Sequence, residues 1–433
     1  MVCLFTYIVK MIKIDTNYRN GVLYIMDKKR KIWNKNYILL LQGQLVSTIG
    51  DSLYSIALAF FVLKLTGSTA LVGMIMGIVT IPRIILGPFA GTIVDRYNRK
   101  MLIVWADLIR GISIVAVSFL AYNDMLKVWM LMAVAVIDGV CATFFNPAME
   151  TVMPMVVPEE KLVKANSIFG MGQSAADIIG QTAGGALYKL LGAPMIFLIN
   201  GISYIFSAGT ETFIKVPYDK TAKQEKSIWQ DMKQGLAYIN RNKGLFWVIV
   251  MSFFINFLFG NIRVLLIPWF TYTEGFGEAH YGFLNGACSV GMIVGMLILS
   301  IVTINDEIKY HVYRLSVFAF IGFVTLGAAV NKFWAVVVCF ILAFMFQIVF
   351  NMLLNATVMV NTPENMRGKV SAVKLTLCMA ASPVGNFIGG FIAEAVSPRM
   401  GIIYSGAIAF VIAFIILCKK DIRQFMVTVQ TQA

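Results

Sequence analysis

Residues 180–185 are Gly-Gln-Thr-Ala-Gly-Gly and residues 385–390 are Gly-Asn-Phe-Ile-Gly-Gly, so three glycines recur after 205 positions. Other residues around this segment recur at the same distance: Pro158 as Pro363, Glu159 as Glu364, Lys164 as Lys369 and Gly201 as Gly406. A single offset that holds across a loop and two apolar segments indicates a duplicated unit. We therefore predict two similar halves joined near the middle of the chain.

The composition indicates a membrane protein. Apolar residues make up 59% of the 433 residues and charged residues only 13%, whereas soluble domains are about half apolar and about a quarter charged. The apolar residues form segments long enough to cross about 30 Å of hydrocarbon as helices, and too long and continuous for barrel strands. Twelve spans are expected, at residues 37–63, 70–94, 101–122, 128–149, 165–188, 194–214, 246–270, 281–303, 313–331, 333–358, 370–394 and 400–418.

These spans predict an all-α membrane fold with twelve transmembrane helices in two six-helix bundles related by pseudo-two-fold symmetry. The expected parts are an N-terminal extension at 1–36, bundles at 37–214 and 246–418, a linker at 215–245 and a tail at 419–433. The linker contains an amphipathic segment at residues 228–239, which we expect to lie on anionic lipid headgroups. Such a linker would let two rigid bundles move against each other.

Lys and Arg residues are concentrated on one side of this predicted topology. With the N-terminus inside, the inner segments hold 27 of the 36 Lys and Arg residues, and cytoplasmic loops usually carry such an excess. We therefore expect both termini in the cytoplasm of a multi-pass protein of the cell membrane, most naturally the bacterial cytoplasmic membrane. The net charge of +14 is spread over many loops, so no nucleic-acid partner is expected.

The first 36 residues allow two interpretations. An apolar opening is interrupted by Lys10 and Lys13, which makes it too short for a transmembrane span or a signal peptide. In one interpretation translation starts at Met26, which is followed by Asp-Lys-Lys-Arg-Lys. In the other the segment is an interfacial extension.

Several classes of activity lack their usual sequence signals. The six cysteines form no CxxC pair, and the two histidines lie in predicted loops, so neither a metal site nor a disulfide is expected. There is no hydrolase nucleophile motif and no Walker loop, so we expect neither an enzyme nor an ATP-driven pump, and no cofactor. A channel would show rings of like residues around one pore, which a two-fold repeat does not favour. The remaining class is a solute carrier, expected as a monomer in the lipid bilayer.

The connection between the second and third spans carries the sharpest local motif. Residues 91–100 are Gly-Thr-Ile-Val-Asp-Arg-Tyr-Asn-Arg-Lys, which resembles the loop motif G-x-x-x-D-R-x-G-R-K of the major facilitator superfamily. Asn98 stands where glycine is usual, and because asparagine tolerates left-handed backbone geometry we expect the turn to be kept. We expect a gating role for this group together with two charges of span 3: Gly91, Asp95, Arg96, Arg99, Lys100, Asp107 and Arg110.

The first half also resembles one branch of that superfamily. Residues 47–54 (Ser-Thr-Ile-Gly-Asp-Ser-Leu-Tyr), 107–110 (Asp-Leu-Ile-Arg) and 146–148 (Asn-Pro-Ala) are similar to the macrolide-efflux group of the drug:proton antiporters. The resemblance implies proton-coupled export of amphipathic small molecules by alternating access. Lysophospholipid carriers of the same superfamily share much of this sequence, so a lysolipid or metabolite carrier is the alternative. Residues 180–185 are similar to the antiporter element G-P-x-x-G-G, with Gln181 in place of proline.

Three acidic residues within spans are candidates for coupling to protons or another cation: Asp51, Asp138 and Asp177. Each charge within a span costs about 2.5–3.5 kcal/mol on insertion scales unless it faces a cavity or a partner. Asp51 lies near the middle of span 1, and burial in a low dielectric favours the protonated form of a carboxyl group. We expect Asp51 to carry the proton, although a static hydrogen bond to a neighbouring helix would also explain it.

A second set of residues is expected to line the cavity between the halves. Gln44, Ser47, Asp51 and Ser55 follow helical spacing and form a polar stripe on span 1. The other candidates are polar or charged residues of spans 2, 7 and 10: Arg83, Asn256, Arg263, Gln347, Asn351 and Asn355. Asn256 lies 205 positions after Asp51, so the second half keeps a polar group there without the titratable one.

Glycines four residues apart occur in spans 5, 8 and 11. This spacing places both glycines on one helix face and lets two backbones approach closely. The repeat relates span 5 to span 11, and span 8 to span 2, which carries Gly87 and Gly91 at the same spacing. We therefore expect the glycines of these spans to form the moving boundary between the halves. The glycines concerned are Gly180, Gly184, Gly185, Gly291, Gly295, Gly385, Gly389 and Gly390.

Overall fold

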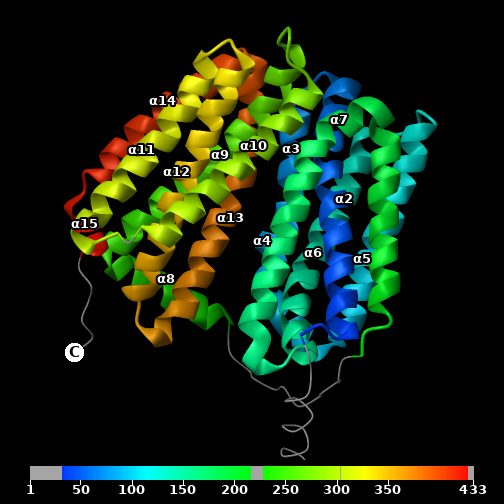
Figure 1. Cartoon of the computed structure of the whole chain (residues 1–433), viewed down its shortest axis with the longest axis horizontal. Coiled ribbons are helices and arrows are strands. Elements are labelled where there is room, and N and C mark those ends of the chain that lie inside the picture. The colour runs from blue at the N-terminus through cyan, green and yellow to red at the C-terminus, as the bar shows by residue number, and fades with distance from the viewer. Residues whose placement is uncertain (1–31, 216–227, 303, 428–433) are drawn as a thin grey trace, which may run out of the picture.

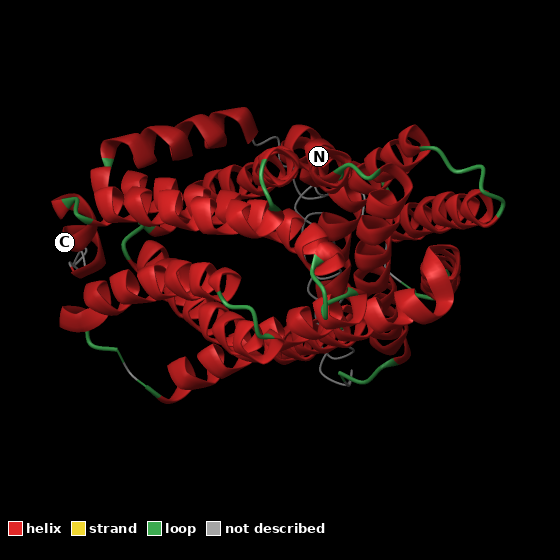
Figure 2. Ribbon diagram, turned by 90° about the horizontal axis from the view of Figure 1, so that it is seen from above, coloured by secondary structure: helices red, strands yellow, loops and turns green. Residues whose placement is uncertain are grey.

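A computed structural model describes residues 32–215, 228–302 and 304–427, and every regular element in these ranges is a helix (Figures 1 and 2). The N-terminal residues 1–31, which include Met26, lie outside the described residues. Eleven of the helices are long and apolar enough to cross a membrane. One of them, α7, contains two of the expected spans, so the predicted all-helical fold with twelve spans is confirmed.

The first half contains six helices in the described chain. They are α2 (Lys35–Thr66), α3 (Thr69–Ile78), α4 (Thr80–Arg96), α5 (Arg99–Tyr122), α6 (Val128–Val156) and α7 (Leu162–Glu211). The expected span 70–94 is divided between α3 and α4, because Pro82 has no N–H to bond the carbonyl of Ile78. Within α7, Gly192 has a left-handed φ of 75°, so the chain turns there between two spans.

The second half has a similar set of helices. They are α9 (Lys243–Tyr272), α10 (Glu278–Ile301), α11 (Asp306–Ala329), α12 (Phe333–Val360), α13 (Glu364–Ala395) and α14 (Pro398–Leu417). Several helices extend past the expected spans; α13 begins at Glu364 where the span was expected from 370. Apolar content marks only the part of a helix inside hydrocarbon, whereas its polar ends continue into the interface.

Two ends of the molecule differ in charge. One end, here called the basic end, carries Lys35 at the start of α2, Arg99 at the start of α5, Lys243 at the start of α9 and Lys419 after α14. The other end, here called the far end, holds the end of α2, the start of α3 and the α9–α10 connection (Figure 1).

The halves are in close contact at the far end. Thr69 of α3 donates a hydrogen bond to the carbonyl of Gly390 on α13 at 2.8 Å. Next to it, Glu394 of α13 accepts from the Ser68 hydroxyl at 2.5 Å and from the Ala70 amide at 3.1 Å. The halves also meet at a second contact, between α7 and α10. There a Cβ added to Gly282 of α10 would lie 2.9 Å from the backbone nitrogen of Gly185 on α7. The far end is therefore closed, with backbones meeting where neither helix carries a side chain.

Most of the glycines singled out in the sequence lie within one half. Gly180 and Gly184 face α2, Gly291 and Gly295 face α12, and Gly385 and Gly389 face α9. Gly185 and Gly390 face the other half, at α10 and α3 respectively. This corrects the expectation that all eight line the boundary: residues i and i+4 share the face that packs inside the bundle, and the following glycine lies about 100° around the helix.

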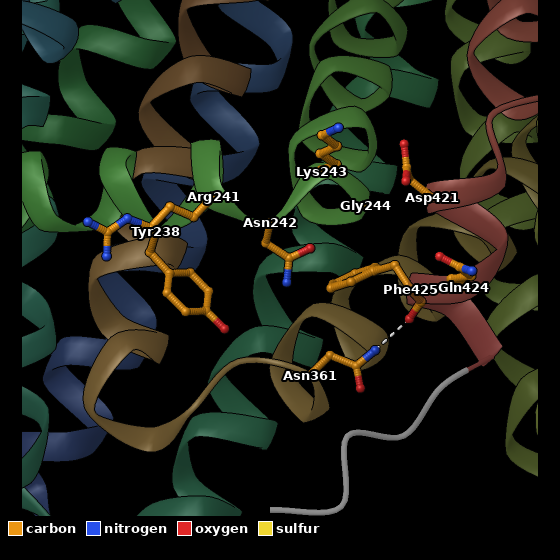
Figure 3. A pocket seen from close by; sticks show the side chains of 9 residues that line it. All are labelled: Tyr238, Arg241, Asn242, Lys243, Gly244, Asn361, Asp421, Gln424 and Phe425. Atoms are coloured by element: carbon orange, nitrogen blue, oxygen red, sulfur yellow. Dashed lines mark hydrogen bonds between the residues drawn. The ribbon is translucent and has the colours of Figure 1, made fainter.

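Two short amphipathic helices lie at the basic end, α8 (Ile228–Arg241) and α15 (Lys420–Val427). Gly235 of α8 lies against the carbonyl of Lys369 on α13, and Ile239 is buried. Figure 3 shows the polar pocket where α8, α9 and α15 meet, and Asn361 donating a hydrogen bond to the Phe425 carbonyl at 2.5 Å. The apolar sides of both helices thus pack on the second half.

Candidate functional site

A cavity of about 800 Å³ lies between the two halves. Its first-half wall comes from α2, α4, α6 and α7, and its second-half wall from α13, with Met232 of α8 at its edge. The polar and charged lining residues are Gln44, Arg83, Thr143, Asn146, Glu150, Asn166, Gln173 and Thr376. Apolar lining residues include Phe145, Met149, Met153, Phe169, Leu375 and Met379. The cavity is therefore mostly apolar with a few polar groups, as is usual for small-molecule sites.

The cavity lies toward the basic end. Its lining reaches Gly91, near the end of α4, and Asn166, near the start of α7. A Cβ added to Gly87, Gly91 or Gly170 would meet no atom within 4 Å, in contrast to the tightly packed glycines of the far end. The two halves are thus separated at the basic end and joined at the far end, which is the geometry of a carrier open to one side.

Asp51 lies beyond the cavity, two helical turns after Gln44 on α2, and its side chain is exposed. Its carboxylate accepts hydrogen bonds from the Tyr204 hydroxyl at 2.6 and 2.8 Å and from the Asn200 amide at 3.4 Å. Tyr204 and Asn200 come from the second span of α7 and are buried. Gly50 makes this contact possible, because a Cβ there would lie 2.7 Å from the Ser203 hydroxyl. The carboxylate is thus held by donors on one side while remaining accessible on the other.

A buried arginine connects Asp51 to the other acidic groups. Arg110 of α5 pairs with Asp138 of α6 at 3.0 Å and with Asp107 at 3.9 Å. Its guanidinium also lies over the rings of Tyr204, at 5.2 Å from the centroid, and Phe145, at 5.6 Å. Because Phe145 lines the cavity, the arginine lies between the cavity wall and the Asp51–Tyr204 pair.

Asp177, the third coupling candidate, has a different environment. Its carboxylate accepts from the Ser52 hydroxyl at 2.5 Å and from the Gln181 amide at 2.8 Å. The first bond joins α2 to α7 and the second lies within α7, one turn along the helix, and Asp177 is absent from the cavity lining. These contacts favour a structural role, in which the carboxylate joins spans 1 and 5.

The expected cavity residues divide into two groups. Gln44 and Arg83 line the cavity, and the Arg83 Nε has no hydrogen-bond partner among the described residues. The remaining candidates are not in the lining: Ser47, Ser55, Asn256, Arg263, Gln347, Asn351 and Asn355. Ser55 and Asn256 instead bond carbonyls of their own helices, and Asn355 accepts from Lys374.

The loop motif between α4 and α5 is placed at the basic end. Lys100, in the first turn of α5, donates a hydrogen bond to the carbonyl of Thr212, the residue after α7, at 2.5 Å. The bond therefore joins the start of α5 to the end of α7. Asn98 has an ordinary φ of −68° and accepts from the Met101 amide at 3.3 Å. Its role is therefore that of a helix N-cap, which corrects the expectation of a left-handed turn. The side chains of Asp95 and Arg96 lie outside the described residues.

Sequence inspection missed several site residues. Thr143, Asn146 and Glu150 of α6 follow three- and four-residue spacing, so they form one face of the helix toward the cavity. That spacing was a usable signal. The sequence around Tyr204 contains no such signal, since a tyrosine in an apolar span usually only packs against neighbouring helices. Glu211, the last residue of α7, is 1% exposed although it borders the polar linker.

Comparison with known proteins identifies relatives over most of the chain. The family model described as Major Facilitator Superfamily matches residues 40–385. Macrolide efflux protein A of Streptococcus pyogenes is 24% identical over 402 residues, which is 92% of this chain and 99% of that protein. The putative bacilysin exporter BacE of Bacillus subtilis (strain 168) is 28% identical over 271 residues, 60% of this chain and 65% of that protein. A solved structure of the nucleoside transporter NupG superposes with a TM-score of 0.71 at 13% identity, covering 88% of this chain and all of that one.

Proposed function

Because this chain belongs to the major facilitator superfamily, we propose that it exports amphipathic small molecules by proton antiport through alternating access. The observation that carries the proposal is the cavity between the halves, open toward the basic end and closed at the far end. The basic end is the cytoplasmic one in this proposal, since cytoplasmic segments carry the excess of Lys and Arg. The structure then corresponds to the conformation that takes substrate from the cytoplasm or the inner leaflet.

The cavity supports an amphipathic substrate. Methionine side chains on both walls, and two phenylalanines on the first-half wall, can adapt to different apolar shapes. Glu150 is exposed in the cavity and offers a charge for a cationic group. The similarity to Macrolide efflux protein A and to the bacilysin exporter supports the outward direction.

Asp51 is the proposed proton carrier. Asp51 is an exposed residue near the middle of α2, and the nearby Arg110–Asp138 pair makes its charge sensitive to rearrangement of α5 and α6. Protonation of Asp51 would weaken the hydrogen bond that its carboxylate accepts from the Tyr204 hydroxyl, and this hydroxyl could then bond another group. Binding of substrate and of the proton can therefore exclude each other through one network, as antiport requires.

The proposal is tested with Asp51→Asn in inverted membrane vesicles, using ethidium as a fluorescent, lipophilic cationic probe. We expect wild-type protein to accumulate ethidium when an inward-acid pH gradient is imposed and to lose the accumulated dye when an uncoupler is added. The Asp51→Asn variant should show no gradient-driven accumulation while its amount in the membrane is unchanged. Asp124→Asn, in a far-end turn, is the matched control. Normal accumulation by Asp51→Asn would remove Asp51 from the mechanism.

One observation favours the alternative, a carrier of anionic lysolipids or metabolites. Arg83 lines the cavity, and its Nε has no hydrogen-bond partner in the part of the chain that the structure describes; a guanidinium suits a phosphate or carboxylate group. The variants Arg83→Gln and Glu150→Gln distinguish an anionic substrate from a cationic one. Loss of transport only in Arg83→Gln would support the anionic substrate, and loss only in Glu150→Gln the cationic one.

A further inference from the structure

A second group of carboxylates lies away from the cavity, inside the first half near the basic end. Asp107 of α5 and Glu211 of α7 are each only 1% exposed. The hydroxyl of Ser207, one turn before Glu211, donates to Glu211 Oε1 at 3.3 Å and also lies beside the Asp107 carboxyl. Two acidic side chains from different helices thus lie on either side of one buried hydroxyl, which donates to Glu211.

These carboxylates have too few partners to be ionised together. Neither oxygen of Asp107 has a hydrogen-bond partner among the described residues, and Oε2 of Glu211 has none either. An ionised buried carboxylate normally accepts several hydrogen bonds or pairs with a cation. Here Glu211 accepts one long hydrogen bond and Asp107 has only the 3.9 Å contact with Arg110, so a bound proton is the simplest way to satisfy the remaining oxygens.

The surrounding charges point the same way. The charged groups that face this pair are Arg110 on α5, Asp138 on α6 and Asp51 on α2. Arg110 lies 3.9 Å from Asp107 but 3.0 Å from Asp138, so Asp138 is its nearer partner. With all four carboxyl groups ionised, one cation would face four negative charges in a low-dielectric interior.

An independent observation connects this pair with Asp51. Ser47 of α2 is 3% exposed, and its hydroxyl oxygen has no hydrogen-bond partner among the described residues. It lies one turn after Gly43, which abuts the Ser207 hydroxyl, and one turn before Asp51. Along α2, a buried hydroxyl without a hydrogen-bond partner among the described residues therefore lies between the contact with Ser207 and Asp51, and a hydroxyl can both donate and accept.

We propose that Asp107 and Glu211 form a second proton-binding site of the first half, which shares one proton and exchanges it with Asp51. This proposal rests on the proposed proton antiport. The step moves one proton between carboxyl oxygens: the O–H bond of the pair breaks as an O–H bond to Asp51 forms, with the hydroxyls of Ser207 and Ser47 between them. Each hydroxyl gives its own proton to the next oxygen as it receives one, so its O–H bond breaks and re-forms and the net change is one proton moved. The position of Glu211 in the last turn of α7 makes this site the one nearer the basic end.

The first test detects the proton directly. Infrared spectra of the purified protein at neutral pH should contain a carbonyl stretch of a protonated carboxyl group, which shifts in heavy water. We expect this band to lose most of its intensity in Glu211→Gln and in Asp107→Asn, and to be unchanged in Glu364→Gln, whose side chain is 84% exposed. An unchanged band in both buried variants would overturn the proposal and leave the antiport through Asp51 untouched.

The second test asks whether the proton takes part in transport. In proteoliposomes, Glu211→Gln should exchange ethidium across the membrane at a rate within about twofold of wild type, and accumulate it at least about tenfold less under a pH gradient. Glutamine mimics the protonated side chain, so folding should be preserved, and retained exchange demonstrates it. Normal gradient-driven accumulation in Glu211→Gln, beside its loss in Asp51→Asn, would overturn the coupling role of the pair alone. Normal accumulation in both variants would remove Asp51 from the mechanism as well, whereas a wild-type protein that shows no gradient-driven accumulation would overturn the proposed function.

Discussion

The two halves share one fold but differ in what fills their interiors. The first half holds a charged network in which Asp107, Arg110, Tyr204 and Glu211 are buried and Asp51 and Asp138 are more exposed. The residues 205 positions later are mostly apolar: Asn256, Val312, Leu315, Ala343, Ala409 and Ile416. Aromatic rings occupy the second half instead, among them Phe320, Phe344 and Phe350 at centroid distances of 5.8–6.3 Å.

This difference has a physical consequence for the duplicated fold. Both halves can supply a wall of the cavity, since helix packing needs only glycines and apolar surfaces. Among the residues that the structure describes, the buried charged side chains, Asp107, Arg110 and Glu211, all belong to the first half. We infer that the first half couples transport to protons and that the second half is the apolar body against which it moves.

The largest effect is expected from removing the charge at the centre of the first half. Arg110→Leu would leave Asp138 and Asp107 buried without a cation, which costs about 3–5 kcal/mol. Thermal unfolding of the detergent-purified protein should show a marked fall in Tm. The matched change in the second half is Arg314→Leu, at an exposed arginine over the Tyr310 ring, and should cost less than about 1 kcal/mol. Equal losses in the two variants would contradict the contrast between the halves.

The next prediction moves the carboxylate between halves. The double variant Asp51→Asn with Asn256→Asp keeps the number of acidic groups. The new carboxylate lies in the second half, away from the Tyr204 hydroxyl and the Arg110 guanidinium that surround Asp51. We expect it to remain without pH-gradient-driven ethidium accumulation, as Asp51→Asn does. Recovery of accumulation in the double variant would show that a carboxylate in either half suffices.

A third prediction concerns the closed far end, where the halves meet. Gly390→Val would place a Cβ 2.7 Å from the Thr69 carbonyl oxygen of the other half, and such overpacking costs about 1–3 kcal/mol. The closed far end should be destabilised, so a cysteine introduced as Leu71→Cys should react faster with a thiol reagent added from that side. Gly389→Val, which faces α9 within the second half, is the control. It should lower stability without raising the reactivity at residue 71.

The smallest effect is expected in the aromatic interior of the second half. Phe350→Leu keeps an apolar side chain of similar size at a position that is 3% exposed, so unfolding should become easier by about 1 kcal/mol. The pH dependence of ethidium transport should stay as in wild type. A shift of that pH profile would show that the second half also takes part in coupling.

Much of the fold could be predicted from the sequence because lipid restricts a chain to helices of a fixed minimum length. The repeat of glycines at an offset of 205 gave the two halves before any helix was placed. It did not give the partners of those glycines, since four-residue spacing fixes the face of a helix but not its neighbour. Gly180 and Gly185 show this, because one faces α2 and the other faces α10.

The candidate site was predicted in part. Asp51, Asp107, Arg110 and Asp138 were singled out because charges are rare in apolar spans, and the structure brings these four together. Tyr204 and Glu211 were not, since a tyrosine within a span and a glutamate at its edge are common without a function. Their roles depend on which helix lies beside them, and that is a property of tertiary packing.

The central claim is that the charged network of the first half carries the proton. It is tested most directly by measuring proton movement during ethidium transport in proteoliposomes, with a pH-sensitive dye trapped in the lumen. Wild-type protein should move protons opposite to ethidium, whereas Asp51→Asn should let ethidium equilibrate with no accompanying proton movement. Proton movement of wild-type size in Asp51→Asn would contradict the account.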